Sequence, residues 1–242
     1  MHPATGVLPP LRPGGPATGT SARFYNPYGV ALSPSGTFAL IADYTYDLLR
    51  HIDVDTAVVT TLAGALNSAG TTDGIGTSAR LNAPSAVCLA DEGRVAFVTD
   101  QGSGRLRRID VGSATVTTIA GSTSSTPLDG VGTNARFYNP AGIAATADGK
   151  TVFVTDFSGH KVRKVDVTTR TVTTLAGRNG NSAGSADGIG ETVGVWPEAA
   201  ETAPAWAAAP AEVAKRSAES MAASALGMTV NSSRRFGICA AS

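Results

Sequence analysis

The sequence predicts an all-β protein made of three similar four-stranded antiparallel sheets, followed by an Ala-rich tail that is disordered or partly helical. The segment ARFYNP or ARLNAP begins at Ala22, Ala79 and Ala135, which are 57 and 56 residues apart. The segment TTLAG or TTIAG recurs with the same two spacings. In addition, 28 glycines together with many valines and threonines favour short strands and turns. A period this long and regular indicates one supersecondary module per repeat.

Each copy contains four segments with strand character. The first follows Pro27, Pro84 or Pro140 and reads YGVAL, SAVCL or AGIAA. A short turn leads to the second, TFALIAD, RVAFVTD or TVFVTD, which is apolar on both faces and therefore needs cover on both sides. The third reads LLRHIDV, RLRRIDV or KVRKVDV, and the fourth reads AVVTTLAG, ATVTTIAG or RTVTTLAG. Neighbouring copies provide the two covers, which describes the blades of an incomplete β-propeller.

Three motifs recur in the same order along the copies. They are P-x-G-[VI]-A at the first strand, [AT]-D at the end of the second and [LV]-R-x-[IV]-D on the third, and the second copy departs at Ala86, where the others have glycine. With these motifs, residues 19–190 resemble the NHL repeat family. The resemblance implies a propeller, commonly six-bladed, that mostly serves as a binding platform. It also implies minority activities, since some related propellers are hydrolases or lyases and some bind RNA through a basic face.

The composition changes at both ends of the repeats. We expect three parts: a disordered N-terminal segment at 1–18, the repeats at 19–190 and an atypical Ala-rich tail at 191–242. The repeats cover about 22–78, 79–134 and 135–190. A weak helix at about 210–228 is the predicted structure of the tail, because Pro210 suits a first helical position and alanine is a good helix former.

Three blades are fewer than the about 4–8 that close a propeller. The DGIG segment returns at Asp187 without the ARF segment that follows it elsewhere. We infer that 19–190 is an internal piece of a longer array, as a truncated gene product would be. The rival interpretation is a short protein that closes by self-association through its exposed blade faces, with the tail helix as a cover.

One end of the blades is the expected binding surface. The loops from the second to the third strand and the connections from the fourth strand to the next first strand emerge there, and we call it the long-loop face. These connections span about twenty residues, a length that is usually functional or disordered. The loops after the second strand differ most between copies, and exposed aromatic residues are common binding anchors. The candidate binding residues are Tyr44, Tyr46, Asp47, Gln101, Phe157 and His160. Alternatively, the aromatic rings pack onto the adjacent blade.

Two charged positions recur in every copy and favour a structural role. The first ends the second strand, where an aspartate holds a turn, and is occupied by Asp43, Asp100 and Asp156. The second lies just past that turn and is occupied by Arg50, Arg107 and Arg163. We expect each arginine to pair with the aspartate of its copy. Catalytic groups need not recur blade by blade, so a ligand role is the weaker alternative.

Charge and motifs weigh against several functions. Lys plus Arg and Asp plus Glu both number 19, which argues against nucleic acid or an anionic membrane as a partner, because such partners are held mainly by a basic surface. An aspartate follows each of the basic stretches RLRR and KVRK two residues later. We therefore interpret the stretches as solvated strand faces. His2, His51 and His160 do not form a metal-ligand cluster, and no nucleophile elbow, phosphate loop or zinc spacing occurs. We expect no catalytic residue, no cofactor and no metal.

The expected function is therefore a non-catalytic NHL-type module that binds a protein or another ligand through its long-loop face. The alternatives are a fragment of a propeller hydrolase or lyase, or of an RNA-binding NHL propeller. No apolar run approaches the roughly 18 residues that cross a bilayer, and the N-terminus lacks the pattern of a signal peptide. We therefore expect no membrane insertion and, by default, a cytoplasmic protein.

Overall fold

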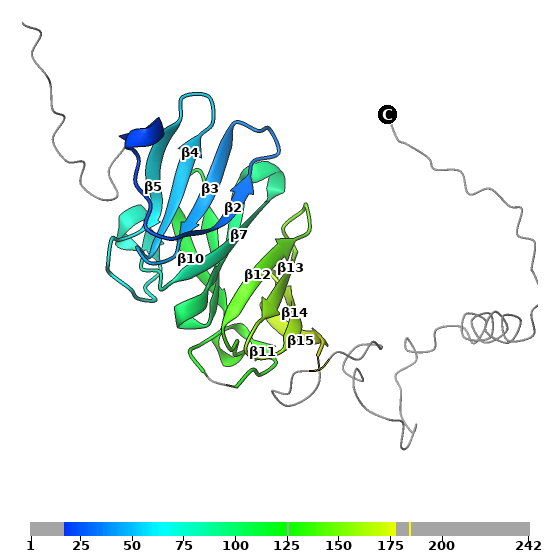
Figure 1. Ribbon diagram of the computed structural model, residues 1–242. Coiled ribbons are helices and arrows are strands. Elements are labelled where there is room, and N and C mark those ends of the chain that lie inside the picture. Colours follow the sequence, from blue (N-terminus) through cyan, green and yellow to red (C-terminus); the bar gives the residue numbers. More distant parts are fainter. Residues whose placement is uncertain (1–16, 125, 178–183, 185–242) are drawn as a thin grey trace, which may run out of the picture. The chain divides into compact units, whose positions relative to one another are not determined.

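The computed structural model describes residues 17–124, 126–177 and 184 of the 242-residue chain. These residues form three five-stranded antiparallel sheets, which we call blades 1, 2 and 3 in chain order (Figure 1). The predicted tail at 191–242 and its helix at 210–228 lie outside the described residues, as do Asp187 and most of the predicted N-terminal segment.

In every blade four long strands pair in chain order, and a two-residue strand from the preceding connection pairs with the fourth. Blade 1 contains β1 (Ala17–Thr18), β2 (Pro27–Leu32), β3 (Phe38–Asp43), β4 (Leu48–Asp53) and β5 (Val58–Gly64). Blade 2 contains β6 (Gly74–Ile75), β7 (Pro84–Ala90), β8 (Val95–Asp100), β9 (Arg105–Asp110) and β10 (Thr115–Ala120). Blade 3 contains β11 (Gly130–Val131), β12 (Pro140–Ala145), β13 (Thr151–Asp156), β14 (Lys161–Asp166) and β15 (Thr171–Ala176). The 3-10 helices are η1 (Gly19–Ser21), η2 (Gly76–Ser78), η3 (Asp91–Gly93), η4 (Gln101–Ser103) and η5 (Gly132–Asn134).

The predicted all-β fold of three antiparallel, propeller-like blades is confirmed, and each blade has one short strand more than the sequence predicts. Gly74–Ile75 pairs with β10, so it belongs to blade 2 although it precedes the predicted repeat boundary at Ala79. Ala17–Thr18, predicted to be disordered, form the equivalent strand β1 and pair with β5. Two residues are too short for an alternating pattern, so only the partner strand reveals them.

The turn between the third and fourth strands is built in the same way in each blade. The aspartate that ends the third strand accepts a hydrogen bond from the backbone N–H three residues later. The three bonds are Thr56 to Asp53 at 2.8 Å, Ser113 to Asp110 at 2.8 Å and Thr169 to Asp166 at 2.7 Å. Bonds from the hydroxyls and backbone N–H groups of Thr56, Ser113 and Thr169 favour the ionised carboxylate and lower the pKa of all three aspartates. The hydroxyl bond is the larger cause at Asp53, and the backbone bond is the larger cause at the other two. The turns are tight, which leaves the opposite end of the blades as the end with long loops.

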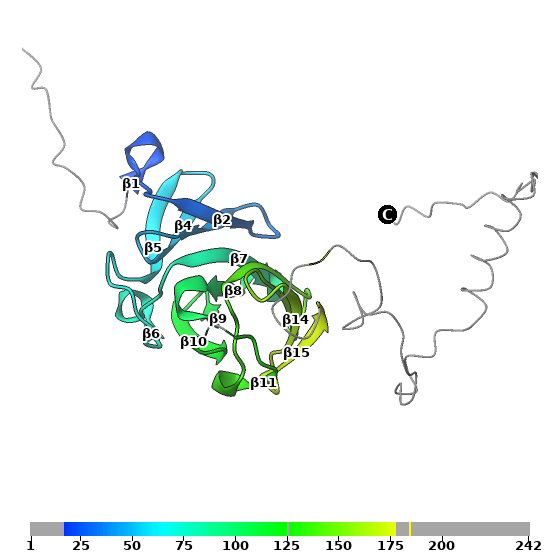
Figure 2. The same ribbon diagram turned by 60° about the horizontal axis from the view of Figure 1, so that its bottom comes forward.

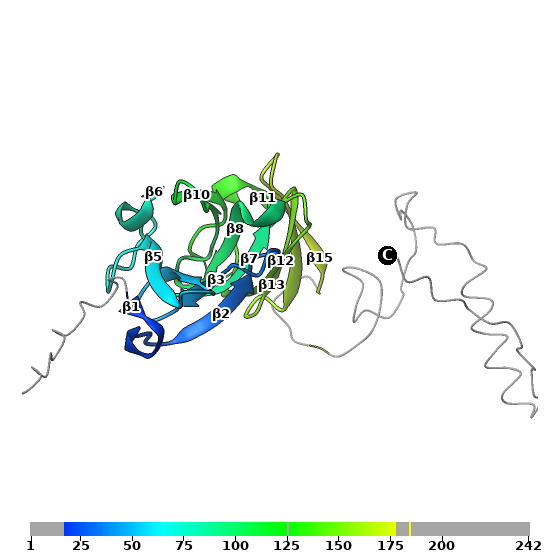
Figure 3. The same ribbon diagram turned by 90° about the horizontal axis from the view of Figure 1, so that it is seen from above.

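Blade 2 lies between blades 1 and 3 (Figures 2 and 3), and its strand β7 runs beside both β2 and β12. Strand β8 is buried along its whole length, whereas β3 and β13 in the outer blades keep partly exposed residues. The predicted cover on both faces of the second strand is therefore complete only in blade 2, because only that blade has a described neighbour on each side.

The core consists of two apolar clusters, one at each junction between blades. The first cluster joins blade 1 residues Leu40, Leu49 and Ala63 to blade 2 residues Leu81, Val87, Val98, Ile109 and Val116. The second joins blade 2 residues Val95, Phe97, Leu106, Ile119 and Ala120 to blade 3 residues Phe137, Val152, Val154, Val165 and Val172. Each blade therefore has a leading face, which packs on the preceding blade, and a trailing face, which packs on the following blade.

At Gly29 the backbones of blades 1 and 2 come into direct contact. A Cβ at Gly29 would lie 2.6 Å from the carbonyl oxygen of Ser85 and 2.8 Å from Cα of Ala86. These backbone atoms cannot rotate away, so we expect Gly29→Ala to force the junction apart and to lower the free energy of unfolding by about 1–3 kcal/mol. Urea unfolding followed by circular dichroism measures the loss.

Gly142 is the matched control, because it holds the equivalent position in blade 3. A Cβ there would meet only the side chain of Thr155, with its Oγ1 at 2.7 Å, and a side chain can change rotamer. Gly142→Ala should therefore cost less than Gly29→Ala. Equal losses in the two variants would show that the backbone contact at the first junction is not the cause.

Candidate functional site

The long-loop face is formed where the first long strand of each blade begins and the second ends. Register pairs at this edge join Pro27 to Asp43, Pro84 to Asp100 and Pro140 to Asp156. The connections at 64–84 and 120–140 also return to this edge, because each of them leads into a first long strand. The face therefore gathers segments that lie far apart in the sequence.

Beneath this face in blade 2, the Arg107 side chain joins three chain segments. Its Nη1 donates to Asp100 Oδ2 at 3.0 Å and to the backbone oxygen of Arg80 at 2.9 Å. Its Nη2 donates to Asp73 Oδ1 at 2.8 Å. Arg107 and Asp100 are fully buried, whereas Asp73 is about half exposed. The guanidinium thereby ties the end of β8 to both parts of the long connection that leads into blade 2.

Both carboxylates of this network have further partners. Asp100 accepts hydrogen bonds from Asn82 N at 2.6 Å and Ser103 Oγ at 2.7 Å. Burial raises the pKa of Asp100, although Arg107 and these bonds favour the ionised form. Asp73 accepts from the backbone and hydroxyl of Thr118 at 3.0 and 2.8 Å. Burial opposes its ionisation, but the bonds from Thr118 and the charge of Arg107 outweigh burial and lower the pKa of Asp73.

The lowered pKa of Asp73 predicts a dependence of stability on pH. A carboxyl with a lowered folded-state pKa stabilises the fold above its unfolded pKa of about 3.9, and this contribution is lost as the pH falls through the folded value. We therefore expect Asp73→Asn to melt at a lower temperature than the wild type near neutral pH. The gap should narrow as the pH falls below about 4 and close only below the lowered folded-state pKa, where the wild-type Asp73 is protonated.

Thermal unfolding at a series of pH values measures this gap. Asp55→Asn, the same exchange in an exposed turn at the other end of blade 1, is the matched control and should melt close to the wild type near neutral pH. A gap for Asp73→Asn that stays constant from neutral to strongly acid pH would contradict the assignment, since it would have to come from packing and not from charge.

Blade 3 repeats the network of blade 2. Arg163 donates from Nη1 to Asp156 Oδ2 at 3.2 Å and to the backbone oxygen of Arg136 at 3.0 Å, and from Nη2 to Asp129 Oδ1 at 2.6 Å. The guanidinium also lies over the ring of Phe137, 5.3 Å from its centroid. Burial raises the pKa of Asp156, with Arg163 acting in the opposite direction. A third buried arginine in blade 1 has the same position but fewer partners.

In blade 1, Arg50 Nη1 lies 4.0 Å from Asp43 Oδ2 and donates to the backbone oxygen of Arg23 at 3.2 Å. Asp43 Oδ2 has no hydrogen-bond partner among the described residues. The sequence has Pro16 where blades 2 and 3 have Asp73 and Asp129. Burial lowers the pKa of Arg50, and the charge of Asp43 offsets part of that effect. The predicted pairing of arginine with aspartate is thus present in all three blades and is weakest in blade 1.

The basic stretches on the third strands differ from the predicted solvated faces. Arg107 and Arg163 are fully buried, and Lys161 is nearly so. Arg105 and Arg108 are partly exposed, and Lys164 is exposed. Because Arg107, Lys161 and Arg163 are buried, the basic stretches do not form a continuous positive surface.

The two candidate tyrosines pack against other tyrosines of their own blade. The ring of Tyr44 lies 5.5 Å from that of Tyr28, and the ring of Tyr46 lies 5.3 Å from that of Tyr25. Tyr44 and Tyr46 are half-buried, while Tyr25 and Tyr28 are both 66% exposed. Each candidate ring therefore packs on an aromatic ring of its own blade, and Tyr25 and Tyr28 are the exposed members of the two pairs.

Asp47 connects blades 1 and 2 and is largely buried. Its Oδ1 accepts a hydrogen bond from the backbone N–H of Ala83 at 2.9 Å. Burial raises the pKa of Asp47, and the bond from Ala83 opposes the rise. The equivalent residues in the other blades are Gly104 and His160, and all three have left-handed backbone conformations with φ between 51° and 62°. The structure thus assigns Asp47 to a junction and not to an open surface.

Phe157 and His160 lie on blade 3, away from the other candidates. Both are exposed, Phe157 at 69%, and both line a shallow hollow of about 270 Å³ together with Val162 and Ala176. Val162 and Ala176 belong to the trailing face of blade 3, because they are equivalent to Leu49 and Ala63 at the first junction. This hollow therefore lies at the trailing face of blade 3.

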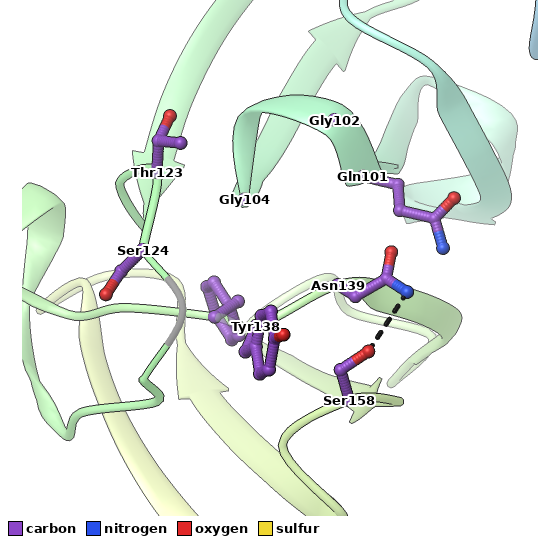
Figure 4. Close-up of a pocket in the computed structure, with 9 residues that line it drawn as sticks. Gln101, Gly102, Gly104, Thr123, Ser124, Tyr138, Asn139 and Ser158 are labelled. Carbon is purple, nitrogen blue, oxygen red and sulfur yellow. Dashed lines mark hydrogen bonds between the residues drawn. The ribbon is translucent and has the colours of Figure 1, made fainter.

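A second hollow, of about 320 Å³, opens on the long-loop face between blades 2 and 3 (Figure 4). Gln101 comes from the loop between β8 and β9, Thr123 and Asn139 from the connection into blade 3, and Ser158 from the loop between β13 and β14. Figure 4 shows the side chains of Gln101 and Asn139 pointing toward one another, and Asn139 Nδ2 donates to Ser158 Oγ at 3.2 Å. The remaining lining residues are Gly102, Gly104, Ser124, Phe137 and Tyr138, so no charged side chain lines this hollow.

Of the six candidate residues, this hollow contains only Gln101. The sequence does not single out Thr123, Asn139 or Ser158. Asn139 belongs to the repeated ARFYNP segment, and its φ of 71° is a left-handed conformation that asparagine tolerates better than most residues. The asparagine before Pro140 therefore indicates a left-handed backbone position, but it does not indicate that its side chain lines a hollow.

The described residues contain no group of three or more His, Cys, Asp or Glu side chains that is placed to hold a metal ion. Within the same residues, no helix has the length and apolar character needed to span a membrane. The chemistry that this face offers therefore consists of uncharged hydrogen-bonding groups and aromatic rings.

Comparison with curated proteins supplies relatives over most of the described residues. The chain is 26% identical over 160 residues to NHL repeat-containing protein 2 of Bos taurus, a match that covers 62% of this chain. It is 30% identical over 158 residues to the Arabidopsis thaliana protein SUPPRESSOR OF QUENCHING 1, chloroplastic, again over 62% of this chain. The three blades are NHL-type repeats. The NHL match covers 22% of the bovine protein and 15% of the plant protein, so this chain spans a small part of either.

No family model matches the chain. Solved structures resemble the NHL blades in fold. A structural genomics protein of unknown function from Bacteroides thetaiotaomicron superimposes with a TM-score of 0.52 at 24% identity, over 69% of this chain and 38% of that one. An auxiliary nutrient binding protein from the same species gives a TM-score of 0.50 at 17% identity, over 65% and 37%. At these identities the likeness concerns the propeller fold alone.

Proposed function

We propose that this NHL array is a non-catalytic binding module that holds a protein partner on its long-loop face. The observation that supports the proposal is the hollow between blades 2 and 3, with its lining of Gln101, Thr123, Asn139 and Ser158. Side-chain amides donate and accept hydrogen bonds at once, and hydroxyls do the same. An uncharged peptide segment, with its alternating N–H and C=O groups, matches this lining.

Rigid support beneath the face favours such binding. Arg107 and Arg163 tie the connections to the strands from below, so the loops around the hollow are held before a partner arrives. A preformed site loses less conformational entropy on binding. The exposed ring of Tyr25, held by Tyr46, offers an aromatic anchor elsewhere on the same face.

The alternative functions require other chemistry. A hydrolase or lyase needs acidic, basic or metal-ligating groups, and an RNA-binding face needs positive charge. The lining of the hollow contains no charged or metal-ligating side chain of these kinds, and its polar side chains are amides and hydroxyls. We keep the cytoplasm as the proposed default compartment, although the plant relative is named as chloroplastic.

Selection from a phage-displayed peptide library tests the proposal. Peptides are enriched on the wild-type chain and their affinities are then measured on Thr123→Trp, in which the indole fills the hollow. The matched control is Thr168→Trp, the same exchange at an exposed turn on the opposite end of blade 3. We expect enriched peptides to bind Thr168→Trp as well as the wild type and to lose at least about tenfold in affinity for Thr123→Trp.

Two results would contradict the proposed function. One is a library that yields no peptide bound above background. The other is a set of peptides that bind Thr123→Trp and the wild type equally, because the hollow would then not be the site.

A further inference from the structure

Two blade faces have no neighbouring blade within the described residues. They are the leading face of blade 1 and the trailing face of blade 3, the counterparts of the faces that form the two existing junctions. Both carry apolar residues that are exposed, namely Val30, Leu32 and Val54 in blade 1 and Leu175 in blade 3, and exposed apolar residues that cluster on one face mark an interaction site.

The leading face of blade 1 carries an apolar residue at every position that packs in blade 2. Val87 of blade 2 is only 6% exposed because blade 1 covers it, whereas its equivalent Val30 is 68% exposed. Likewise Leu32, equivalent to the packed Leu89, is 61% exposed. The remaining equivalent positions in blade 1 are Ala22, Phe24, Ala39, Ile41, Ile52, Val54 and Val59. The face therefore has the composition of a junction. Ile41 and Val59 are buried, whereas Val30, Leu32 and Val54 are exposed.

The trailing face of blade 3 is the matching half. Ile119 of blade 2 is 4% exposed at the second junction, whereas its equivalent Leu175 is 46% exposed. The other equivalent positions in blade 3 are Ala144, Thr146, Thr151, Phe153, Val162 and Ala176. All of these except Thr146 and Thr151 are apolar.

We propose that a second copy of this chain docks on these faces, with blade 3 of each copy packed on blade 1 of the other. The contact repeats an interface that the chain already makes twice, with apolar residues at equivalent positions on both sides. Because the contact is head-to-tail, it can form twice between two copies. Two sets of three blades make six, which lies within the about 4–8 blades of closed propellers.

Polar positions across the junctions agree with this arrangement. At the first junction the side chain of Asp47 accepts a hydrogen bond from Ala83 N. The equivalents of these residues at the new junction are His160 and Asn26, and both are exposed in the single chain. The imidazole of His160 has a nitrogen that can accept such a bond, and the backbone N–H of Asn26, which donates to Asp43 Oδ1 at 3.1 Å in the single chain, would be shared between the two acceptors. Phe157 and His160, which the sequence singles out for binding, thereby become residues at the junction between two copies.

Light scattering coupled to size exclusion on the full chain tests the proposal. We expect the wild type at micromolar concentration to have twice the chain mass of 24.4 kDa. Val30→Arg and Leu175→Arg each place a charge at both junctions of the ring, and should weaken the dimer by about tenfold or more. Ile75→Arg is the matched control. Ile75 is 64% exposed on an edge strand of blade 2, so it belongs neither to the leading face of blade 1 nor to the trailing face of blade 3.

Mixing the two variants separates the head-to-tail arrangement from others. Val30→Arg keeps an intact trailing face and Leu175→Arg an intact leading face, so the mixture should form heterodimers through one unmodified junction. Restored association also shows that both variants are folded. A monomeric wild type would overturn the proposal. A dimer that only one of the two substitutions weakens, or a mixture that does not associate, would overturn it as well. None of these readouts depends on peptide binding at the long-loop face.

Discussion

Replacing Arg107 with leucine is expected to lower the free energy of unfolding by about 3–5 kcal/mol, because it removes one partner of a buried ion pair. Asp100 would remain fully buried without its counter-ion, and burial already raises the pKa of that carboxyl. The backbone oxygen of Arg80 would also lose its bond from Arg107, and the Asp73 carboxylate would keep only its bonds from Thr118. Urea unfolding, followed by circular dichroism, measures the loss.

The chain offers two matched controls for this prediction. Arg50→Leu removes the equivalent arginine of blade 1, where the carboxylate of Asp43 lies 4.0 Å away, so it should cost less. Arg108→Leu changes the next residue of β9, which is half-buried, and should cost little. Combining Arg107→Leu with Asp100→Asn should recover part of the loss, because the unpaired charge is removed as well. A loss for Arg107→Leu no larger than that for Arg108→Leu would contradict the structural role of the network.

Replacing Phe97 with alanine, as a single substitution, is expected to lower the free energy of unfolding by about 3–5 kcal/mol, because it opens a cavity at the junction of blades 2 and 3. Phe97 is fully buried and packs with residues of both blades. Its ring also lies 3.8 Å from the position of a Cβ at Gly149, in the first turn of blade 3. The blades cannot close the gap without moving the strands that surround it.

Thermal unfolding measures the total loss for Phe97→Ala, and amide hydrogen exchange locates it. Protection should fall in β13 and β14, which lie against the altered face. Phe38→Ala is the control, since Phe38 is only half-buried and stacks at 5.0 Å on His51 near the edge of blade 1. If the two variants lose the same stability, or if β13 keeps its protection, the junction is not held by Phe97.

The strands of the three blades could be predicted because their signals are local. Each long strand has an apolar pattern and flanking turn residues, and the repetition of the segments shows which strands are equivalent. The pairing of Arg107 with Asp100 could also be predicted, since the two residues face each other across one turn. The third member, Asp73, could not, because it comes from the preceding connection.

The candidate site was harder to predict. Gln101 lines the hollow, but Tyr44 and Tyr46 lie against other tyrosines of blade 1. Asp47 accepts a hydrogen bond from Ala83 N at the junction of blades 1 and 2. The hollow depends on which loops meet across the junction between blades 2 and 3. Residues as distant in sequence as Gln101 and Ser158 meet there, and no local pattern records that meeting.

The amino-acid order alone establishes what repeats: four strands per module, a buried second strand and an Arg–Asp pair at its end. These features follow from alternation along a strand and from turn chemistry, both of which act over a few residues. The packing of one blade on the next decides which aromatic rings are exposed, where a hollow opens and which faces have no neighbouring blade among the described residues. Val30 and Val87 hold the same place in two modules, and only the presence of a neighbour makes one surface and the other core.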